Sequence, residues 1–138
     1  PQLGKGGGSS QRTMTVIIMA VVAVLSALIS VNGAVAALLP VVVVIATKMT
    51  MPAARLLLPL AFGAHAGSLL TLTGSPVNVI MSELAEEETG RAFGFFEFGL
   101  VGLPIMAGTV LITLLLGSRL IPARVPTTIA ADLSDHAR

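Results

Sequence analysis

A long apolar run near the N-terminus is the feature that most constrains how this chain folds. The run extends from Met14 to Thr47, and as one straight helix it would measure about 50 Å. The hydrocarbon core of a bilayer is only about 30 Å thick. Asn32-Gly33, a strong turn signal, lies near the middle of the run. We therefore expect a helical hairpin with its tip at Asn32 and Gly33.

The composition is typical of a membrane protein. Hydrophobic residues make up 54% of the chain and charged residues 11%, whereas a soluble domain has about a quarter of charged residues. Two further apolar blocks, roughly 56–81 and 100–121, are long enough to enter a bilayer. The sequence has no cysteine, no nucleophile beside a base and no phosphate-binding loop. We expect an all-α, multi-pass membrane protein that is not an enzyme and binds no nucleic acid.

The two arms of the hairpin have about 16 to 18 residues each, at or below the lower limit for a membrane span. Short arms favour a re-entrant hairpin, in which the tip lies near the membrane centre and lines a site or cavity. Two full spans joined by a short loop are the alternative.

The second block, residues 53–82, contains a helix break. Pro76 removes a backbone donor and disfavours helical geometry at Ser75, and Gly74 precedes both. We expect a first half-helix to about Leu70, an unwound stretch, and a second half-helix that starts near Pro76. In a discontinuous helix, freed carbonyls suit a cation and a helix N-terminus suits an anion.

The domain organisation follows from these blocks. We expect a flexible cytoplasmic segment (1–13), a transmembrane segment (14–122) and a cytoplasmic tail or linker (123–138). Within the membrane segment we expect the hairpin (14–47), the broken helix (53–82), an outer loop (83–98) and a full span (99–121). This layout places the basic residues on one side and the glutamates of the outer loop on the other. The positive-inside rule then predicts a cytoplasmic N-terminus in the cell membrane, plasma or inner.

Two stretches of the sequence resemble a known family. "SALISVNGAVAALLPVV" is similar to the hairpin motif of the divalent-anion:sodium symporters, and "RLLLPLAFGAHAGSLLTLTGSPVNVI" is similar to their broken helix. The family contains citrate, dicarboxylate and sulfate permeases. The resemblance implies part of a secondary active transporter for a small anion, coupled to sodium or protons. It also implies a second inverted repeat, a homodimer and contact with membrane lipid.

The resemblance implies roles for individual residues. The residues that would contact substrate are Asn32, Gly33, Thr73, Ser75, Pro76 and Asn78. The candidate sodium ligands are Ser30, Asn32, Gly74 and Asn78, and no cofactor other than this ion is expected. His65 is ionisable within a span, which makes it either a functional residue or a neutral partner of a neighbouring helix.

This chain departs from the family pattern at two positions of the hairpin motif. Val31 stands where serine or asparagine is expected, and Gly33 stands where threonine is expected. These departures favour an alternative in which the segment is a degenerate or truncated membrane module that does not transport. A second alternative is an arsenite or cation carrier of the same superfamily.

Overall fold

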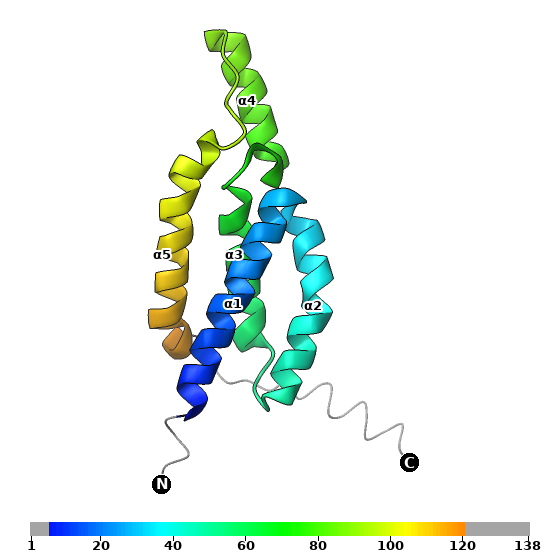
Figure 1. Ribbon diagram of the computed structural model, residues 1–138, viewed down its shortest axis with the longest axis vertical. Helices are drawn as coiled ribbons and strands as arrows, with labels where there is room; N and C mark the ends of the chain where they lie inside the picture. The colour runs from blue at the N-terminus through cyan, green and yellow to red at the C-terminus, as the bar shows by residue number, and fades with distance from the viewer. Residues whose placement is uncertain (1–5, 121–138) are drawn as a thin grey trace.

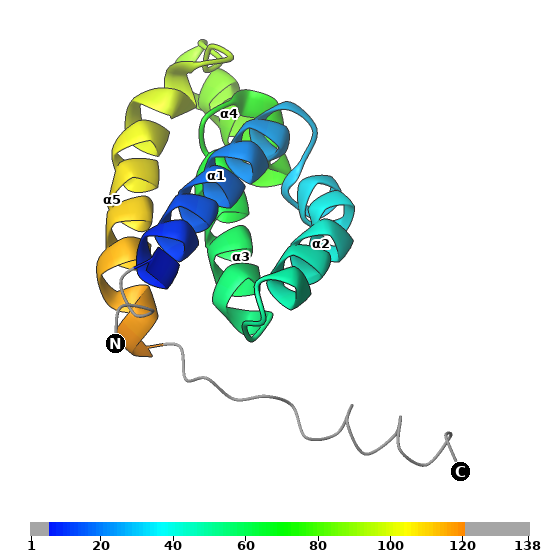
Figure 2. The ribbon, with the colours of Figure 1, turned by 60° about the horizontal axis from the view of Figure 1, so that its bottom comes forward.

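The chain is all-helical over residues 6–120, which are the residues described in this computed structural model (Figure 1). The elements in chain order are α1 (Gly6–Leu28), α2 (Val31–Lys48), α3 (Ala54–Ser68), the 3-10 helix η1 (Leu72–Gly74), α4 (Pro76–Thr89) and α5 (Glu97–Leu120). Figures 1 and 2 both show α1 and α3 between α2 on one side and α5 on the other. The expected tail, 123–138, lies outside the described residues.

Three helices within residues 6–120 are long and apolar enough to cross a membrane. Their apolar windows are Ser10–Leu28, Val31–Lys48 and Glu97–Gly117. This finding confirms the predicted all-α, multi-pass membrane segment. The windows in α1 and α2 are both of span length, so the re-entrant hairpin stays a prediction and two full spans stay its alternative.

α1 and α2 form the predicted hairpin, but its tip lies earlier in the chain than predicted. The helices are interrupted at Ile29 and Ser30, whereas Asn32 and Gly33 belong to the first turn of α2. Ser30 is the N-cap residue, and its Oγ accepts a hydrogen bond from the backbone N–H of Gly33 at 3.2 Å. A serine cap satisfies a first-turn donor that would otherwise lack a partner, so the helix resumes directly after Ser30.

The predicted broken helix is present as α3, η1 and α4. The chain is extended at Ser75, with φ −143° and ψ 140°, and α4 begins at the next residue. Pro76 occupies the first turn of α4, where a missing N–H costs no helical hydrogen bond. The Ser75 Oγ accepts from the N–H of Val77 at 3.3 Å, so a serine caps α4 as another caps α2.

α3 is the central helix and packs against α1, α2 and α5. The largest fully buried apolar side chains near it are Met19, Val22, Val42, Leu56 and Leu60. Gly63 and Gly67 face α1 so closely that a Cβ at Gly67 would lie 2.6 Å from the carbonyl oxygen of Ala23. Small residues at this contact therefore let the backbones of α1 and α3 approach each other.

The flexible segment predicted for residues 1–13 is shorter than expected, because α1 already begins at Gly6. The Thr15 Oγ1 donates to the carbonyl of Gln11 at 3.0 Å, so the polar turn continues the apolar helix. Extending an existing helix by one residue adds one backbone hydrogen bond and fixes the backbone of only that residue. Residues 6–13 contain no proline that would interrupt the helix. Residues 1–5 lie outside the described part of the chain.

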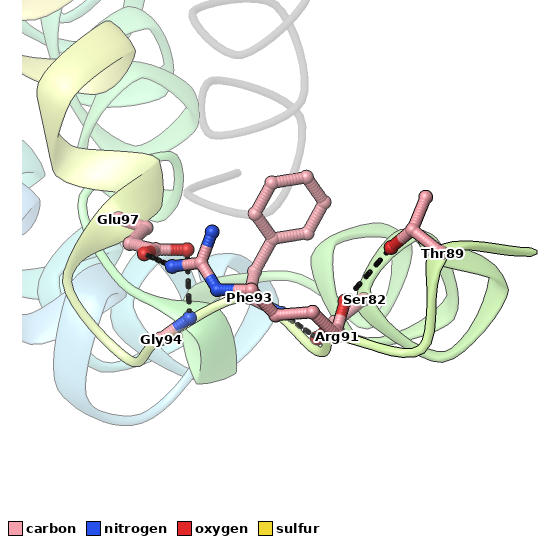
Figure 3. Close-up of polar contacts among 6 residues, drawn as sticks. All are labelled: Ser82, Thr89, Arg91, Phe93, Gly94 and Glu97. Atoms are coloured by element: carbon pink, nitrogen blue, oxygen red, sulfur yellow. Dashed lines mark hydrogen bonds and ion pairs between the residues drawn. The ribbon is translucent and has the colours of Figure 1, made fainter. Parts of the chain in front are cut away.

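The outer loop predicted for residues 83–98 is also shorter than expected. α4 continues to Thr89, since its glutamates are good helix formers, and it ends at Gly90 with a left-handed φ of 73°. The connection to α5 therefore spans only residues 90–96. Figure 3 shows how it is held: Arg91 pairs with Glu97, and the N–H of Phe93 donates to the Ser82 Oγ at 3.0 Å.

α5 begins beside the helix break, which is the stretch of residues 69–75 between α3 and α4. The N–H of Leu72 donates to the carbonyl of Phe95 at 2.9 Å. On α5, a Cβ at Gly102 would lie 2.7 Å from the carbonyl carbon of Leu69, so this glycine contacts the last turn of α3 directly. The start of α5 thus covers one side of the break.

Charges lie at opposite ends of the helical bundle, as the topology predicts. Arg12, Lys48 and Arg55 are near the start of α1, the end of α2 and the start of α3, which lie at one end in Figure 1. α4 projects from the other end and carries Glu83, Glu86, Glu87 and Glu88.

Candidate functional site

The hairpin tip, taken as residues 29–33, presents polar groups at the start of α2. Asn32 is exposed, and its side chain has no hydrogen-bond partner within the described part of the chain. Gly33 is also exposed, and Ser30 is half-buried. The N-terminal end of an 18-residue helix carries a partial positive charge, so these groups surround a position that favours an anion.

The break presents a second group of polar residues. Gly74 is buried because the chain folds back on α3, and a Cβ there would lie 2.9 Å from the carbonyl carbon of Ser68. Thr73 is exposed and makes no side-chain hydrogen bond with any described residue. Ser75 and Pro76 form the start of α4, which is the second helix N-terminus of the candidate site.

Asn78 differs from the other candidate residues because it is 3% exposed and fully engaged with the backbone as a donor. Its Nδ2 donates to the carbonyl of Ser68 at 2.9 Å and to the carbonyl of Thr71 at 2.9 Å. These two carbonyls are among the groups that the break frees from helical pairing.

Two buried hydrogen bonds join the break and α3 to the end of α1. The Thr71 Oγ1 donates to the carbonyl of Ala27 at 2.5 Å, and the Ser26 Oγ donates to the carbonyl of Ala64 at 2.7 Å. The structure therefore brings the hairpin tip and the break to the same end of the bundle. Among the described residues, no hydrogen bond joins Asn32 directly to a residue of the break.

The sequence prediction named Thr73 and Ser75 as site residues and did not include Thr71 among them. Gly63 and Gly67 are spaced by four residues, which places them on one side of α3, and Thr71 follows in extended geometry three residues after the end of this helix. At the two glycines a Cβ would meet residues of α1, and the Thr71 hydroxyl contacts α1 further along, at the carbonyl of Ala27. The spacing of the two glycines is the sequence signal for the close contact of α3 with a neighbouring helix.

His65 lies one turn before the end of α3 and is exposed. Its Nδ1 is 2.8 Å from the carbonyl oxygen of Ala61, so Nδ1 carries a proton and donates it to this carbonyl. The described residues contain no group of three histidine, cysteine or carboxylate side chains that could hold a metal ion. The candidate sodium ligands are instead hydroxyl, amide and carbonyl oxygens.

An open groove of about 360 Å³ lies between the end of α1 and the start of α5. Its lining residues are Val24, Ala27, Leu28, Leu70, Thr71, Phe96, Gly99, Leu100 and Leu103. The Thr71 hydroxyl is the one polar side chain among them, and its proton is already donated to Ala27. The groove therefore offers an anion no unengaged polar side chain, so the candidate site is at the tip and the break.

Comparisons with known proteins place this chain among membrane transporters. The family model described as "Citrate transporter" (CitMHS) matches residues 3–131. An uncharacterized transporter of Synechocystis sp., sll0640, is 32% identical over 120 residues, which cover 87% of this chain and 20% of that protein. The uncharacterized transporter YfbS of Escherichia coli is 32% identical over 114 residues, covering 83% of this chain and 19% of that protein.

A shorter stretch of 59 residues is 41% identical to the human P protein, covering 43% of this chain and 7% of that protein. No solved structure matches this chain. The chain spans about a fifth of the length of the two uncharacterized transporters. Because the family model matches nearly the whole chain, and both sequence motifs resemble those of divalent-anion:sodium symporters, the protein belongs to the citrate transporter family.

Proposed function

We propose that the complete protein carries a small anion, such as a dicarboxylate, citrate or sulfate, across the membrane, and that this segment supplies part of its binding site. The observation that carries the proposal is the buried hydrogen bond from Thr71 to Ala27. It holds the break beside the hairpin tip, so two helix N-termini lie at the same end of the bundle. A buried anion needs donors and positive charge that are already in place.

The anion would meet donors from both elements. Asn32 and Gly33 supply an amide side chain and an accessible backbone in the first turn of α2. Thr73, Ser75 and Pro76 supply hydroxyl groups and the start of α4. The positive ends of two helices favour a carboxylate or a sulfate without a fixed cationic side chain.

The coupling ion would bind to oxygen atoms of the same two elements, the hairpin tip and the break. Of the four candidate sodium ligands, Ser30, Asn32 and the backbone of Gly74 offer hydroxyl, amide and carbonyl oxygens. The fourth, Asn78, donates its Nδ2 protons to two carbonyls. Unwound carbonyls at a discontinuous helix are the usual cation ligands in secondary transporters. A proton is the alternative coupling ion.

The tip and the break would move together during transport. The close contact of α1 with α3, and the bonds from Ser26 and Thr71, join the two elements into one packed unit. In alternating access, such a unit moves relative to the rest of the protein, which the resemblance identifies as a second inverted repeat. A homodimer is the expected assembly.

The basic end of the bundle would face the cytoplasm, with the N-terminus on the same side. Arg12, Lys48 and Arg55 lie at this end, and the glutamates of α4 lie beyond the other. Exposed apolar side chains of α5, including Leu100, Leu103 and Leu115, would contact lipid or the remainder of the transporter.

Val31 and Gly33 support a second candidate function, a membrane module that does not transport. Neither residue carries a side-chain oxygen, so the tip offers the Asn32 amide and the Ser30 hydroxyl alone as polar side chains. An arsenite or cation carrier is the other alternative.

The test is uptake of radiolabelled citrate, succinate and sulfate by the complete protein in membrane vesicles. We expect uptake of at least one anion, driven by an inward gradient of sodium or protons. Vesicles without the protein, and vesicles whose gradient is collapsed by an ionophore, are the controls. If none of the three anions enters under either gradient, anion transport is rejected; uptake of arsenite alone would instead favour the carrier of the wider superfamily.

A further inference from the structure

Among the described residues, Asn78 is the one residue of α4 whose side chain donates hydrogen bonds to the backbone on the α3 side of the break. Its Nδ2 is 2.9 Å from the Ser68 carbonyl, at the end of α3, and 2.9 Å from the Thr71 carbonyl, before η1. Asn78 itself belongs to the first turn of α4. A single amide therefore connects the segment before the break with the segment after it.

The two partners of the Asn78 side chain determine whether its amide nitrogen or its amide oxygen faces them. Both partners are carbonyl oxygens, which accept hydrogen bonds, so the amide nitrogen faces them and donates one proton to each. The nitrogen occupies the place between two converging carbonyls where a cation ligated by them would lie. In this arrangement Asn78 is a donor to the break rather than a ligand for sodium.

Thr71 links Asn78 to the hairpin by two hydrogen bonds in series. The Thr71 backbone accepts from Asn78, and its hydroxyl donates to the Ala27 carbonyl at 2.5 Å. Both side chains are buried, with Asn78 3% and Thr71 4% exposed. Gly74 fits within this fold only because it lacks a Cβ, since one would lie 2.9 Å from the Ser68 carbonyl carbon.

We propose that Asn78 is a positioning residue that holds the break closed against α3 and, through Thr71, against the hairpin. It keeps Thr73, Ser75 and the start of α4 in a fixed arrangement without contacting substrate or the coupling ion. The proposal rests on the proposed function only in treating the break as part of a transport site. Its test below does not require transport.

Replacement of Asn78 by aspartate separates the two roles. A carboxylate is a stronger cation ligand than an amide, so a sodium ligand would keep or increase the affinity for sodium. If Asn78 acts as a donor, the substitution should instead break both hydrogen bonds, because an ionised carboxylate cannot donate to the two carbonyl oxygens that it would face. Protonation of the buried carboxyl restores one donor, so the defect should lessen as the pH falls.

The experiment measures the rate at which a thiol reagent labels Thr73→Cys in the complete protein, with any native cysteines replaced. Thr73 is exposed and makes no side-chain hydrogen bond with described residues, which makes it a suitable reporter on the break. We expect Asn78→Asp to raise the labelling rate about tenfold at about pH 8, because two hydrogen bonds are lost. The labelling rate of Asn78→Asp is compared at each pH with that of the Thr73→Cys parent. This difference in rate should become severalfold smaller between about pH 8 and about pH 5.

Two further variants control for general effects. Asn78→Ala should also raise the labelling rate, but without this dependence on pH, since it has no titratable group. Thr47→Ala should leave the rate unchanged, because the exposed Thr47 hydroxyl lies at the other end of α2 and donates only to carbonyls of that helix. Unchanged labelling of Thr73→Cys in both Asn78 variants, or a higher affinity for sodium in Asn78→Asp, would overturn the positioning role. The proposed anion transport would be unaffected by either outcome.

Discussion

Replacing Gly67 by alanine is expected to destabilise the protein by about 3 kcal/mol or more, which is at or above the usual cost of overpacking a core. An alanine Cβ at this position would lie 2.6 Å from the Ala23 carbonyl oxygen and 2.7 Å from the Ala23 Cβ. The obstacle is the backbone of α1, which cannot rotate away as a flexible side chain can. Relief therefore requires α1 and α3 to separate, and this would also break the bonds from Ser26 and Thr71.

The measurement is the thermal unfolding midpoint of the complete protein in detergent, with the yield of monodisperse protein as a second readout. Gly108→Ala is the matched control, because a Cβ built there has no described atom within 4 Å apart from its chain neighbours and the backbone of its own helix. Alanine is also favoured over glycine in a helix by about 1 kcal/mol, so this variant should be unchanged or slightly more stable. Equal midpoints for the two variants would contradict the close contact between α1 and α3.

Replacing Asn32 by alanine is expected to reduce anion uptake by about 10-fold to 100-fold while leaving the protein folded. A hydrogen bond to a charged group contributes about 1.5 to 3 kcal/mol, which corresponds to a loss of this size. Stability should change by about 0.5 kcal/mol or less, since Asn32 is exposed and has no partner among the described residues.

Initial rates of uptake at normal expression, together with the unfolding midpoint, check this expectation. Thr47→Ala is the matched control on the same helix. Its hydroxyl is exposed at the other end of α2 and donates only to carbonyls of that helix, at Val43 and Val44. Uptake by Asn32→Ala at the rate of the parent would remove Asn32 from the site and leave it as a residue of the first helical turn.

The broken helix could be predicted from the sequence because proline and glycine act locally. Pro76 cannot donate to a helix interior and is well suited to a first turn, and the structure starts α4 at this residue. The tip of the hairpin could not be placed as well. Asn32-Gly33 is a stronger turn signal than Ser30, but a serine cap needs only one N–H partner to start a helix, and Gly33 provides it.

The candidate site was predicted in part, since the sequence gives residue types but not their distances across the fold. Asn78 was predicted from its motif as a ligand, and its burial and two carbonyl partners are known only from the packed structure. Thr71 and Thr73 are similar in sequence context, yet one is buried against α1 and the other is exposed. The difference arises from the close approach of α1 at Gly63 and Gly67, which is a tertiary contact.

The central claim is that the hairpin tip and the break contribute to one anion site. The most direct test is protection of engineered thiols by substrate in the complete protein, with any native cysteines replaced. Ala36→Cys reports on the tip, because Ala36 is exposed one turn after Asn32 on the same side of α2. Thr73→Cys reports on the break, and Thr47→Cys reports on the opposite end of α2 as the control. A saturating transported anion is predicted to slow labelling at Ala36→Cys and Thr73→Cys, and not at Thr47→Cys; slowing at neither position, or at one of the two alone, would contradict a shared site.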